Sequence, residues 1–258
     1  MNSYNKDTIN QVIASNPEIK KVVDAIKEEN HLFLSRFTHE LRNPLTLVKS
    51  TIQLIESQHP EVTNFKYWNS LITDLNDTVA ILNDLSSYNH CDQLHVSEID
   101  LLEFVKQSVE SIQPFASNKS LQLKLTTDSR EDIYRTYPCD KGKMKELLTN
   151  LLKNAVEAAY SDTMILVELS TKESKTNGLY IYISITNSGD PISPENVTHI
   201  FEPFVTTKSG GSGLGLAISK KIANLHKGDL SVSQTDCTVT FTLQIPIDVT
   251  EKESFITA

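Results

Sequence analysis

The segment FLSRFTHELRNPLTLV, residues 33–48, repeats hydrophobic residues with the period of a helix and places a histidine and a proline among them. The hydrophobic positions recur every three or four residues and share one helical face: Phe33, Phe37, Leu41, Leu45, Val48, Ile52 and Ile55. His39 lies two residues before Leu41, about 200° around the helix, and therefore points away from this face. Pro44 follows and is expected to bend the helix. We therefore expect any chemistry of this helix to take place at His39.

The composition predicts an acidic protein of two modest domains. The chain has 258 residues, with 24 Lys and Arg against 33 Asp and Glu, which gives a net charge of −9. This length is sufficient for two hydrophobic cores. The negative charge argues against non-specific binding to nucleic acids or to anionic membranes, so we expect no nucleic-acid partner.

The cysteines and the lack of long apolar runs indicate a soluble cytoplasmic protein. Cys91, Cys139 and Cys237 are odd in number, far apart and without metal-ligand spacing, so we expect reduced thiols. No apolar run approaches the ~18 residues of a membrane span. The N-terminal sequence MNSYNKDTINQ lacks the hydrophobic core of a signal peptide.

Two long helices are predicted in the first third of the chain. The helix that carries His39 begins after Pro17 and runs to about Ser57, where SQHPEVT forms a turn. A second amphipathic stretch follows, with Trp68 and Ile72 alongside the periodic residues Leu71, Leu75, Val79, Leu82 and Leu85. Such a pair forms an antiparallel hairpin, and one hairpin cannot bury both apolar stripes. We expect a four-helix bundle made by a homodimer; the alternative is a monomeric coiled-coil spacer.

The polar segment SSYNHCDQ, residues 86–93, marks the boundary to a domain of mixed pattern. Helical periods at 101–116, 140–160 and 213–226 alternate with strand-like segments at 121–125, 132–137, 164–171, 179–187, 230–234 and 239–246. This predicts a two-layer α/β sandwich. The expected organisation is an N-terminal helical extension (1–30), a helical domain (31–90), a linker (91–97), the α/β domain (98–248) and a C-terminal tail (249–258).

Two asparagines in ELLTNLLKNAVEAAY, residues 146–160, suggest a polar function on an otherwise apolar helix. Asn150 and Asn154 are four residues apart on one helical face. Asparagine is a middling helix former and is costly to bury without partners. The pair is consistent with oxygen ligands for Mg²⁺ that carries a nucleotide, or with two exposed side chains that have no such role.

A glycine-rich loop leads directly into the last predicted helix. In FEPFVTTKSGGSGLGLAISKKI, Gly211, Gly213 and Gly215 allow backbone N–H groups to approach a phosphate at a helix N-terminus, and Lys208 can add a direct contact. Flexible loops have similar sequences, and this one does not follow a strand directly, so a dinucleotide-binding fold is not expected. Upstream, Gly189 follows the strand that ends at Asn187 and allows close approach of a flat ligand.

These motifs, taken in order, resemble those of the histidine kinases of two-component signalling. HELRNP resembles the phosphoacceptor box, NLLKNA the Asn box, NSGDPI the first glycine box, and FEPF with GSGLGL the lid and second glycine box. The resemblance covers about residues 30–246. It implies a dimeric phosphotransfer hairpin followed by an ATP-binding domain of the type shared with DNA gyrase and the Hsp90 chaperone.

The resemblance also implies a role for each matching residue. His39 receives the γ-phosphoryl group of ATP, Glu40 accepts the other imidazole proton, and Asn154 holds Mg²⁺. The implied nucleotide contacts are Asn150, Asn154, Asn187, Gly189, Ile192, Lys208, Gly211, Gly213, Leu214, Gly215 and Leu216. The phosphoryl group then passes to an aspartate in the receiver domain of a response regulator, and an upstream sensor or regulatory protein supplies the stimulus.

The sequence departs from the family pattern at several of these positions. Asn187 stands where relatives usually offer an aspartate to the adenine amino group, and Pro191 replaces a glycine. Glu157 and Ala158 replace a lysine and an aromatic residue, so Lys153 or Lys208 is expected to supply the phosphate contact. Related ATPases that hydrolyse ATP carry a glutamate where Asn150 stands, and an asparagine cannot act as a base; transfer to a histidine is therefore favoured over hydrolysis.

Two alternatives to a kinase remain: a phosphatase or phosphotransfer scaffold with a degenerate ATP site, and a non-enzymatic ATP-gated interaction module. Asn43, one helical turn after His39, is expected to orient water for dephosphorylation of the regulator. Its alternative role is structural, since it precedes Pro44 and can satisfy a freed backbone group.

Overall fold

The computed structural model describes residues 13, 15–91, 93–174, 178–206, 208 and 211–247. Contacts divide the chain into two units, Met1–His90 and Cys91–Ala258, which are described separately below. The predicted tail 249–258 lies outside the described residues, as do residues 175–177 between two of the predicted strands and the first part of the predicted extension 1–30.

The first unit is built on the long helix α2, Pro17–Gln58. Asn16 caps its N-terminus because the side chain accepts hydrogen bonds from the backbone N–H groups of Glu18 and Ile19 at 3.0 and 3.2 Å. Pro17 occupies the first turn, where its missing N–H costs nothing. The helix continues through Pro44, so the proline does not end it.

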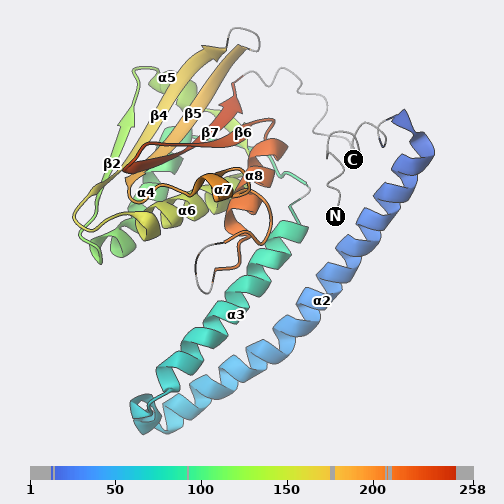
Figure 1. Ribbon diagram of the computed structural model, residues 1–258, viewed down its shortest axis with the longest axis vertical. Helices are drawn as coiled ribbons and strands as arrows, with labels where there is room; N and C mark the ends of the chain where they lie inside the picture. The colour runs from blue at the N-terminus through green and yellow to red at the C-terminus, as the bar shows by residue number, and fades with distance from the viewer. Residues whose placement is uncertain are drawn as a thin grey trace. The chain divides into compact units, whose positions relative to one another are not determined.

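A short 3-10 helix, η1 (Pro60–Asn64), turns the chain into α3, Trp68–Asn89. Side chains join the two long helices along their length: Lys49 Nζ donates to Asn76 Oδ1 at 3.0 Å, and Asn89 Nδ2 donates to the His31 carbonyl at 2.9 Å. These pairs fix an antiparallel arrangement (Figure 1). The chain therefore contains the helical hairpin that the apolar periods predict.

The second unit contains a five-stranded mixed sheet in the order β2-β4-β5-β7-β6. Strands β2 and β4 are parallel, and the remaining neighbours are antiparallel. Strands β1 and β3 form a separate antiparallel pair. The elements are β1 (Ser97–Ile99), α4 (Leu101–Ser117), β2 (Gln122–Thr127), α5 (Glu131–Tyr134), β3 (Tyr137–Cys139), α6 (Lys141–Ala158), β4 (Met164–Ser174), β5 (Gly178–Ser188), α7 (Pro194–Val197), α8 (Gly215–Leu225), β6 (Asp229–Gln234) and β7 (Thr238–Pro246).

Helices α4, α6 and α8 cover one face of this sheet (Figure 1). Alternate residues of the central strands are buried beneath them, namely Ile181, Ile183, Ile185, Val239, Phe241, Leu243 and Ile245, while the residues between them are partly exposed. The predicted two-layer α/β sandwich is confirmed.

The segment 132–137 was expected to be a strand, and this expectation is wrong. Residues up to Tyr134 form the short helix α5, and only Tyr137 enters strand β3. Tyr134 is fully buried and its hydroxyl donates to Asp128 Oδ1 at 2.7 Å, which holds the segment in a turn instead of an extended strand. A six-residue alternation of apolar and polar residues cannot distinguish these two outcomes.

Candidate functional site

Helix α6 carries the predicted asparagines at the border between its buried and exposed faces. Its N-cap is Asp140, whose Oδ1 accepts from the Lys143 N–H at 3.0 Å. Leu147, Leu148, Leu151 and Leu152 are buried, whereas Asn150 and Asn154 are only partly buried. The amides can therefore reach a ligand that lies outside the hydrophobic core.

His226, just after α8, ties that helix to the beginning of α6. Its Nε2 accepts from the Asp140 N–H at 3.0 Å, and its Nδ1 lies 2.8 Å from the Ile222 carbonyl. Burial lowers the pKa of His226, so the ring stays neutral and keeps an acceptor nitrogen for Asp140. The two helices that carry the predicted nucleotide contacts are thus held together at one end.

Near the other end of α8, Asn150 contacts the start of the helix. Asn150 Nδ2 lies 3.3 Å from the Gly215 carbonyl, as a hydrogen-bond donor. A Cβ on Gly215 would meet only the Asn150 side chain, at 3.7 Å. The α8 N-terminus has no side-chain cap in the structure, so the first-turn N–H groups that follow Leu214 lack a capping side chain and suit an anion.

Lys208 is brought to the same face of α6 from a distant part of the sequence. Its Nζ donates to Asn154 Oδ1 at 2.9 Å and forms an ion pair with the Glu157 carboxylate. The predicted residues Asn154 and Lys208 therefore meet. The role of Glu157 as the partner of Lys208 was missed from the sequence, where Glu157 counted only as a departure from the family pattern.

The glycines of the last loop have different surroundings. Gly213 has a φ of +66°, and a Cβ there would lie 2.6 Å from the Phe204 carbonyl carbon. The Phe204 N–H donates to the Gly213 carbonyl at 2.9 Å, so the two loop segments lie backbone against backbone. Gly211 is exposed, Leu214 is buried, and Leu216 is partly exposed in the first turn of α8. Backbone contacts therefore hold the two ends of this loop together.

Asn187, at the end of β5, is almost fully buried, with 2% of its surface exposed. Its Nδ2 atom is shielded from solvent and has no hydrogen-bond partner in the described part of the chain. A buried donor without a partner is costly, so a ligand that supplies an acceptor fits this position.

Gly189 has a packing role that was not expected from the sequence. A Cβ at Gly189 would lie 2.4 Å from the Ala158 carbonyl oxygen, so the glycine is required for close packing against the end of α6. Its expected contact with a flat ligand stays a prediction. Next to it, the Tyr160 hydroxyl donates to Asp190 Oδ1 at 2.5 Å. These contacts join α6 to the loop after β5.

Ile192 is fixed by a side chain that sequence reasoning missed. Gln234 Oε1 accepts from the Ile192 N–H at 2.9 Å, and Gln234 Nε2 donates to the Ile192 carbonyl at 2.9 Å. The double hydrogen bond mimics strand pairing and anchors the loop to β6. No periodic pattern links Gln234 to Ile192, so this contact could not be predicted from the sequence.

In the helical unit, His39, Glu40 and Asn43 are all exposed on α2. Asn43 follows His39 by one helical turn, so both side chains project from neighbouring parts of the helix surface. Among the described residues, no three His, Cys, Asp or Glu side chains gather in a way that could hold a metal ion. A Mg²⁺ ion would therefore depend on amide oxygens and nucleotide phosphates, which is usual for this ion.

Residues 139–248 match the family of histidine kinase-, DNA gyrase B- and HSP90-like ATPases. Most of the α/β domain is therefore similar to this ATPase family. Sensor histidine kinase ZraS of Escherichia coli K12 is 30% identical over 83% of this chain, and Sporulation kinase E of Bacillus subtilis 168 is 27% identical over 77%. The resemblance to two-component histidine kinases is thereby confirmed. The chain spans 45% of ZraS and 26% of Sporulation kinase E.

Solved structures agree with this ATPase-family fold. The catalytic domain of histidine kinase ThkA has a TM-score of 0.50 at 29% identity and covers 59% of this chain and 95% of its own. Full-length ShkA, solved in complex with AMPPNP, has a TM-score of 0.65 over 83% of this chain and 45% of its own, and its 24% identity shows similarity of fold. No helix among the described residues is long and apolar enough to cross a membrane.

Proposed function

We propose that the chain is an ATP-dependent protein-histidine kinase that phosphorylates itself on His39. The observation that carries the proposal is the presence, in one chain, of an exposed histidine on a helical hairpin and an ATPase-family domain. The proposed domains are the phosphotransfer hairpin at 31–90 and the catalytic domain at 98–248, joined by residues 91–97 and flanked by the segments 1–30 and 249–258.

The arrangement around α6 and α8 supports a nucleotide site. Asn187 offers its unpaired amide to the base, while the first turn of α8 and Lys208 bind the phosphates. The remaining proposed contacts are Asn150, Gly189, Ile192, Gly211, Gly213, Leu214, Gly215 and Leu216. Asn154 is the proposed magnesium ligand, and Mg²⁺ supplies neutralisation of phosphate charge there. Because Lys208 bonds Asn154 Oδ1, it has to leave this oxygen when the metal binds.

The proposed chemistry is a transfer to nitrogen. A ring nitrogen of His39 attacks the γ-phosphorus of ATP, and an N–P bond forms as the bond to the β,γ-bridging oxygen breaks and ADP leaves. Glu40 takes the proton from the other ring nitrogen. Asn150, an amide, cannot deprotonate water, which favours transfer over hydrolysis.

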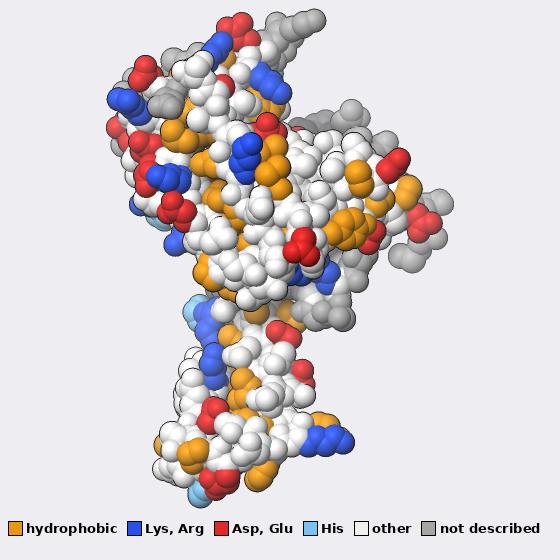
Figure 2. Space-filling view, turned by 90° about the vertical axis from the view of Figure 1, so that its left-hand side faces the viewer, with side chains coloured by type: hydrophobic (Ala, Val, Ile, Leu, Met, Phe, Trp, Pro, Cys, Tyr) orange, Lys and Arg blue, Asp and Glu red, His pale blue; other side chains and the backbone are white. Residues whose placement is uncertain are grey.

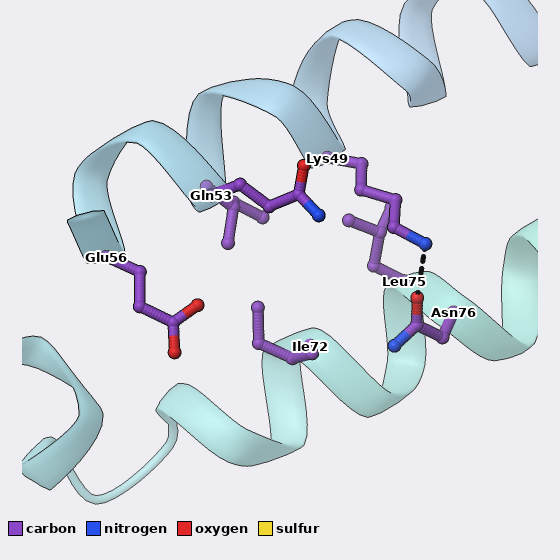
Figure 3. A pocket seen from close by; sticks show the side chains of 7 residues that line it. Lys49, Gln53, Glu56, Ile72, Leu75 and Asn76 are labelled. Atoms are coloured by element: carbon purple, nitrogen blue, oxygen red, sulfur yellow. Dashed lines mark hydrogen bonds between the residues drawn. The ribbon is translucent and has the colours of Figure 1, made fainter.

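The helical unit acts as a homodimer in this proposal. Leu41, Val48 and Ile55 recur every seven residues of α2 and remain 36, 47 and 38% exposed in the single chain. Hydrophobic side chains are visible along the helical part of the molecule (Figure 2). Near the closed end of the hairpin, Ile52, Ile72 and Leu75 line a hollow between α2 and α3 that polar side chains border (Figure 3). A second hairpin would cover these surfaces and complete a four-helix bundle; a monomeric mass by light scattering at micromolar concentration would contradict this.

The decisive experiment is incubation of the chain with radiolabelled ATP and Mg²⁺. The kinase proposal expects an acid-labile label that is lost in His39→Ala. Nucleotide binding without label supports a scaffold with a degenerate site or an ATP-gated module, and contradicts the kinase.

A second activity is proposed because Asn43 is exposed one turn after His39. After the phosphoryl group has passed to the aspartate of a response regulator, Asn43 orients the water molecule that hydrolyses this aspartyl phosphate. In Asn43→Ala, we expect the regulator phosphatase activity to disappear while labelling of His39 from ATP survives. Loss of both activities would assign a structural role to Asn43. The upstream sensor remains part of the proposal, and a phosphotransfer profile against all response regulators of the source organism would identify the target.

A further inference from the structure

The carboxamide of Asn187 is buried at the end of β5, and no hydrogen bond to the described residues holds its nitrogen. Its Nδ2 is shielded from solvent and no acceptor in the described part of the chain reaches it. The residue directly opposite on β7 is Val239, which is 4% exposed and has no polar side-chain atom. Directly opposite side chains of antiparallel strands lie on the same face of the sheet, so Val239 cannot supply the missing partner.

An amide in this position differs from a carboxylate in more than its charge. It carries one acceptor atom and one donor atom, and rotation of the terminal group by about 180° exchanges them. A carboxylate accepts in both orientations. The buried nitrogen of Asn187 makes no hydrogen bond to the described residues. Rotation of the amide therefore breaks no hydrogen bond of this nitrogen. The atom presented to a ligand can therefore be either the acceptor or the donor.

The two purines differ at the atom that such a group contacts. Adenine carries an amino donor at position 6, and guanine carries an oxygen acceptor there. With oxygen presented, Asn187 accepts from the adenine amino group; with nitrogen presented, it donates to the guanine oxygen. An aspartate can only accept, so it would leave the guanine oxygen against a negative charge.

We propose that Asn187 makes the site a purine-nucleotide site that takes guanosine triphosphate as well as ATP as phosphoryl donor. The inference rests on the proposed function, in which Asn187 faces the base. The reaction is otherwise unchanged: His39 gains the γ-phosphoryl group and the nucleoside diphosphate leaves.

The test compares kcat/KM for labelling of the full chain by ATP and by GTP, both with Mg²⁺. The wild-type chain is expected to use GTP within about tenfold of ATP, because either base pairs with one atom of the Asn187 amide and leaves the other atom unpaired in the same way. Asn187→Asp should raise the ATP preference by at least about tenfold, since the donor is lost. Asn187→Leu is the matched variant: it keeps the approximate size of the side chain but removes the donor and the acceptor together, so both nucleotides should be used less well and their ratio should stay within about tenfold.

The competing outcomes are distinct. If the wild-type chain labels with ATP but rejects GTP by more than about a hundredfold, and neither variant changes that ratio, the inference is wrong while the kinase proposal stands. If no nucleotide labels His39, calorimetric titration with ADP and GDP still tests the base selectivity. Similar affinities in the wild-type chain, with selectivity for ADP in Asn187→Asp, support the role of Asn187, and strong preference for ADP in both proteins overturns it. Should Asn187→Asp fail to fold, the ratio of the two affinities in the wild-type chain decides, because a strong preference for ADP there overturns the inference.

Discussion

Replacement of Gly213 by alanine tests whether the last glycine loop is held by its own backbone. Gly213 has a φ of +66°, where a non-glycine residue costs about 1–2 kcal/mol. The new Cβ would also lie 2.6 and 2.8 Å from the carbonyl carbon and Cα of Phe204, and 2.9 Å from the Val205 nitrogen. These are backbone atoms, so the clash adds an overpacking cost of about 1–3 kcal/mol. We therefore expect Gly213→Ala to lower the free energy of unfolding by about 2–5 kcal/mol.

Gly178 provides a matched control for the backbone conformation. Its φ is +87°, but a Cβ there would meet no atom of the described residues within 4 Å. Gly178→Ala should therefore cost only about 1 kcal/mol, or roughly 2–4 °C in Tm, whereas Gly213→Ala should lower Tm by on the order of 10 °C. Differential scanning calorimetry measures both values.

Replacement of Gly215 tests whether a glycine leaves space for a ligand without relieving strain in the chain. A Cβ there would make ordinary contact with Asn150 at 3.7 Å, so Gly215→Ala should change stability by less than about 0.5 kcal/mol. If phosphate occupies this space, ATP affinity measured by calorimetric titration should nevertheless fall by about tenfold or more. Equal Tm losses for Gly213→Ala and Gly178→Ala, or a large Tm loss for Gly215→Ala, would refute the reasoning.

Three other contacts give testable expectations. Glu157→Gln removes the ionic partner of Lys208 and leaves the lysine available for a phosphate. Because both side chains are partly exposed, we expect ATP to bind only about two- to fivefold more tightly. Glu157→Asp, which keeps the charge, is the control. Tyr134→Phe should lower the free energy of unfolding, measured in urea, by about 1 kcal/mol. Asp128→Ala should lower it by about 3 kcal/mol, because Asp128 also accepts from the Thr171 N–H and hydroxyl at 2.7 and 2.8 Å. Equal losses in the two variants would contradict this network. Burial holds the pKa of His226 below 6.5, so the unfolded chain binds a proton at a higher pH than the folded chain does. The free energy of unfolding should therefore fall as the pH drops below about 6.5. If His226→Ala shows the same dependence of stability on pH, His226 is not its source.

The elements that could be predicted from the sequence are those fixed by local signals. The long helix α2 begins beside Pro17, where Asn16 supplies the cap, and α6 follows the Asp140 cap with its leucines in helical period. Strands β5 and β7 were predictable because residues 181–185 and 239–245 place an apolar residue at every second position. The short segment around Tyr134 was assigned wrongly because its conformation depends on hydrogen bonds to Asp128, which no periodic pattern reveals.

The contacts that shape the candidate site could not be predicted because they join segments far apart in the chain. Lys208 meets Asn154 and Glu157 across 54 and 51 residues, and Gln234 meets Ile192 across 42 residues. Charge and hydrogen-bonding capacity show that such residues need partners, but not which partner the fold supplies. The exposed position of His39 was different, since the helical period alone placed it away from the apolar face.

The glycines show why a motif can be recognised before the role of each residue is known. From the sequence, all of them suggested close approach of a nucleotide. In the structure, Gly189 and Gly213 make room for the protein's own backbone, at Ala158 and Phe204, whereas Gly215 faces the side chain of Asn150. The first two therefore preserve the shape of the site whether or not a nucleotide binds. Retention of the glycine pattern is consequently evidence of fold, and the test of nucleotide chemistry has to fall on Gly215, Asn150 and the polar side chains beside them.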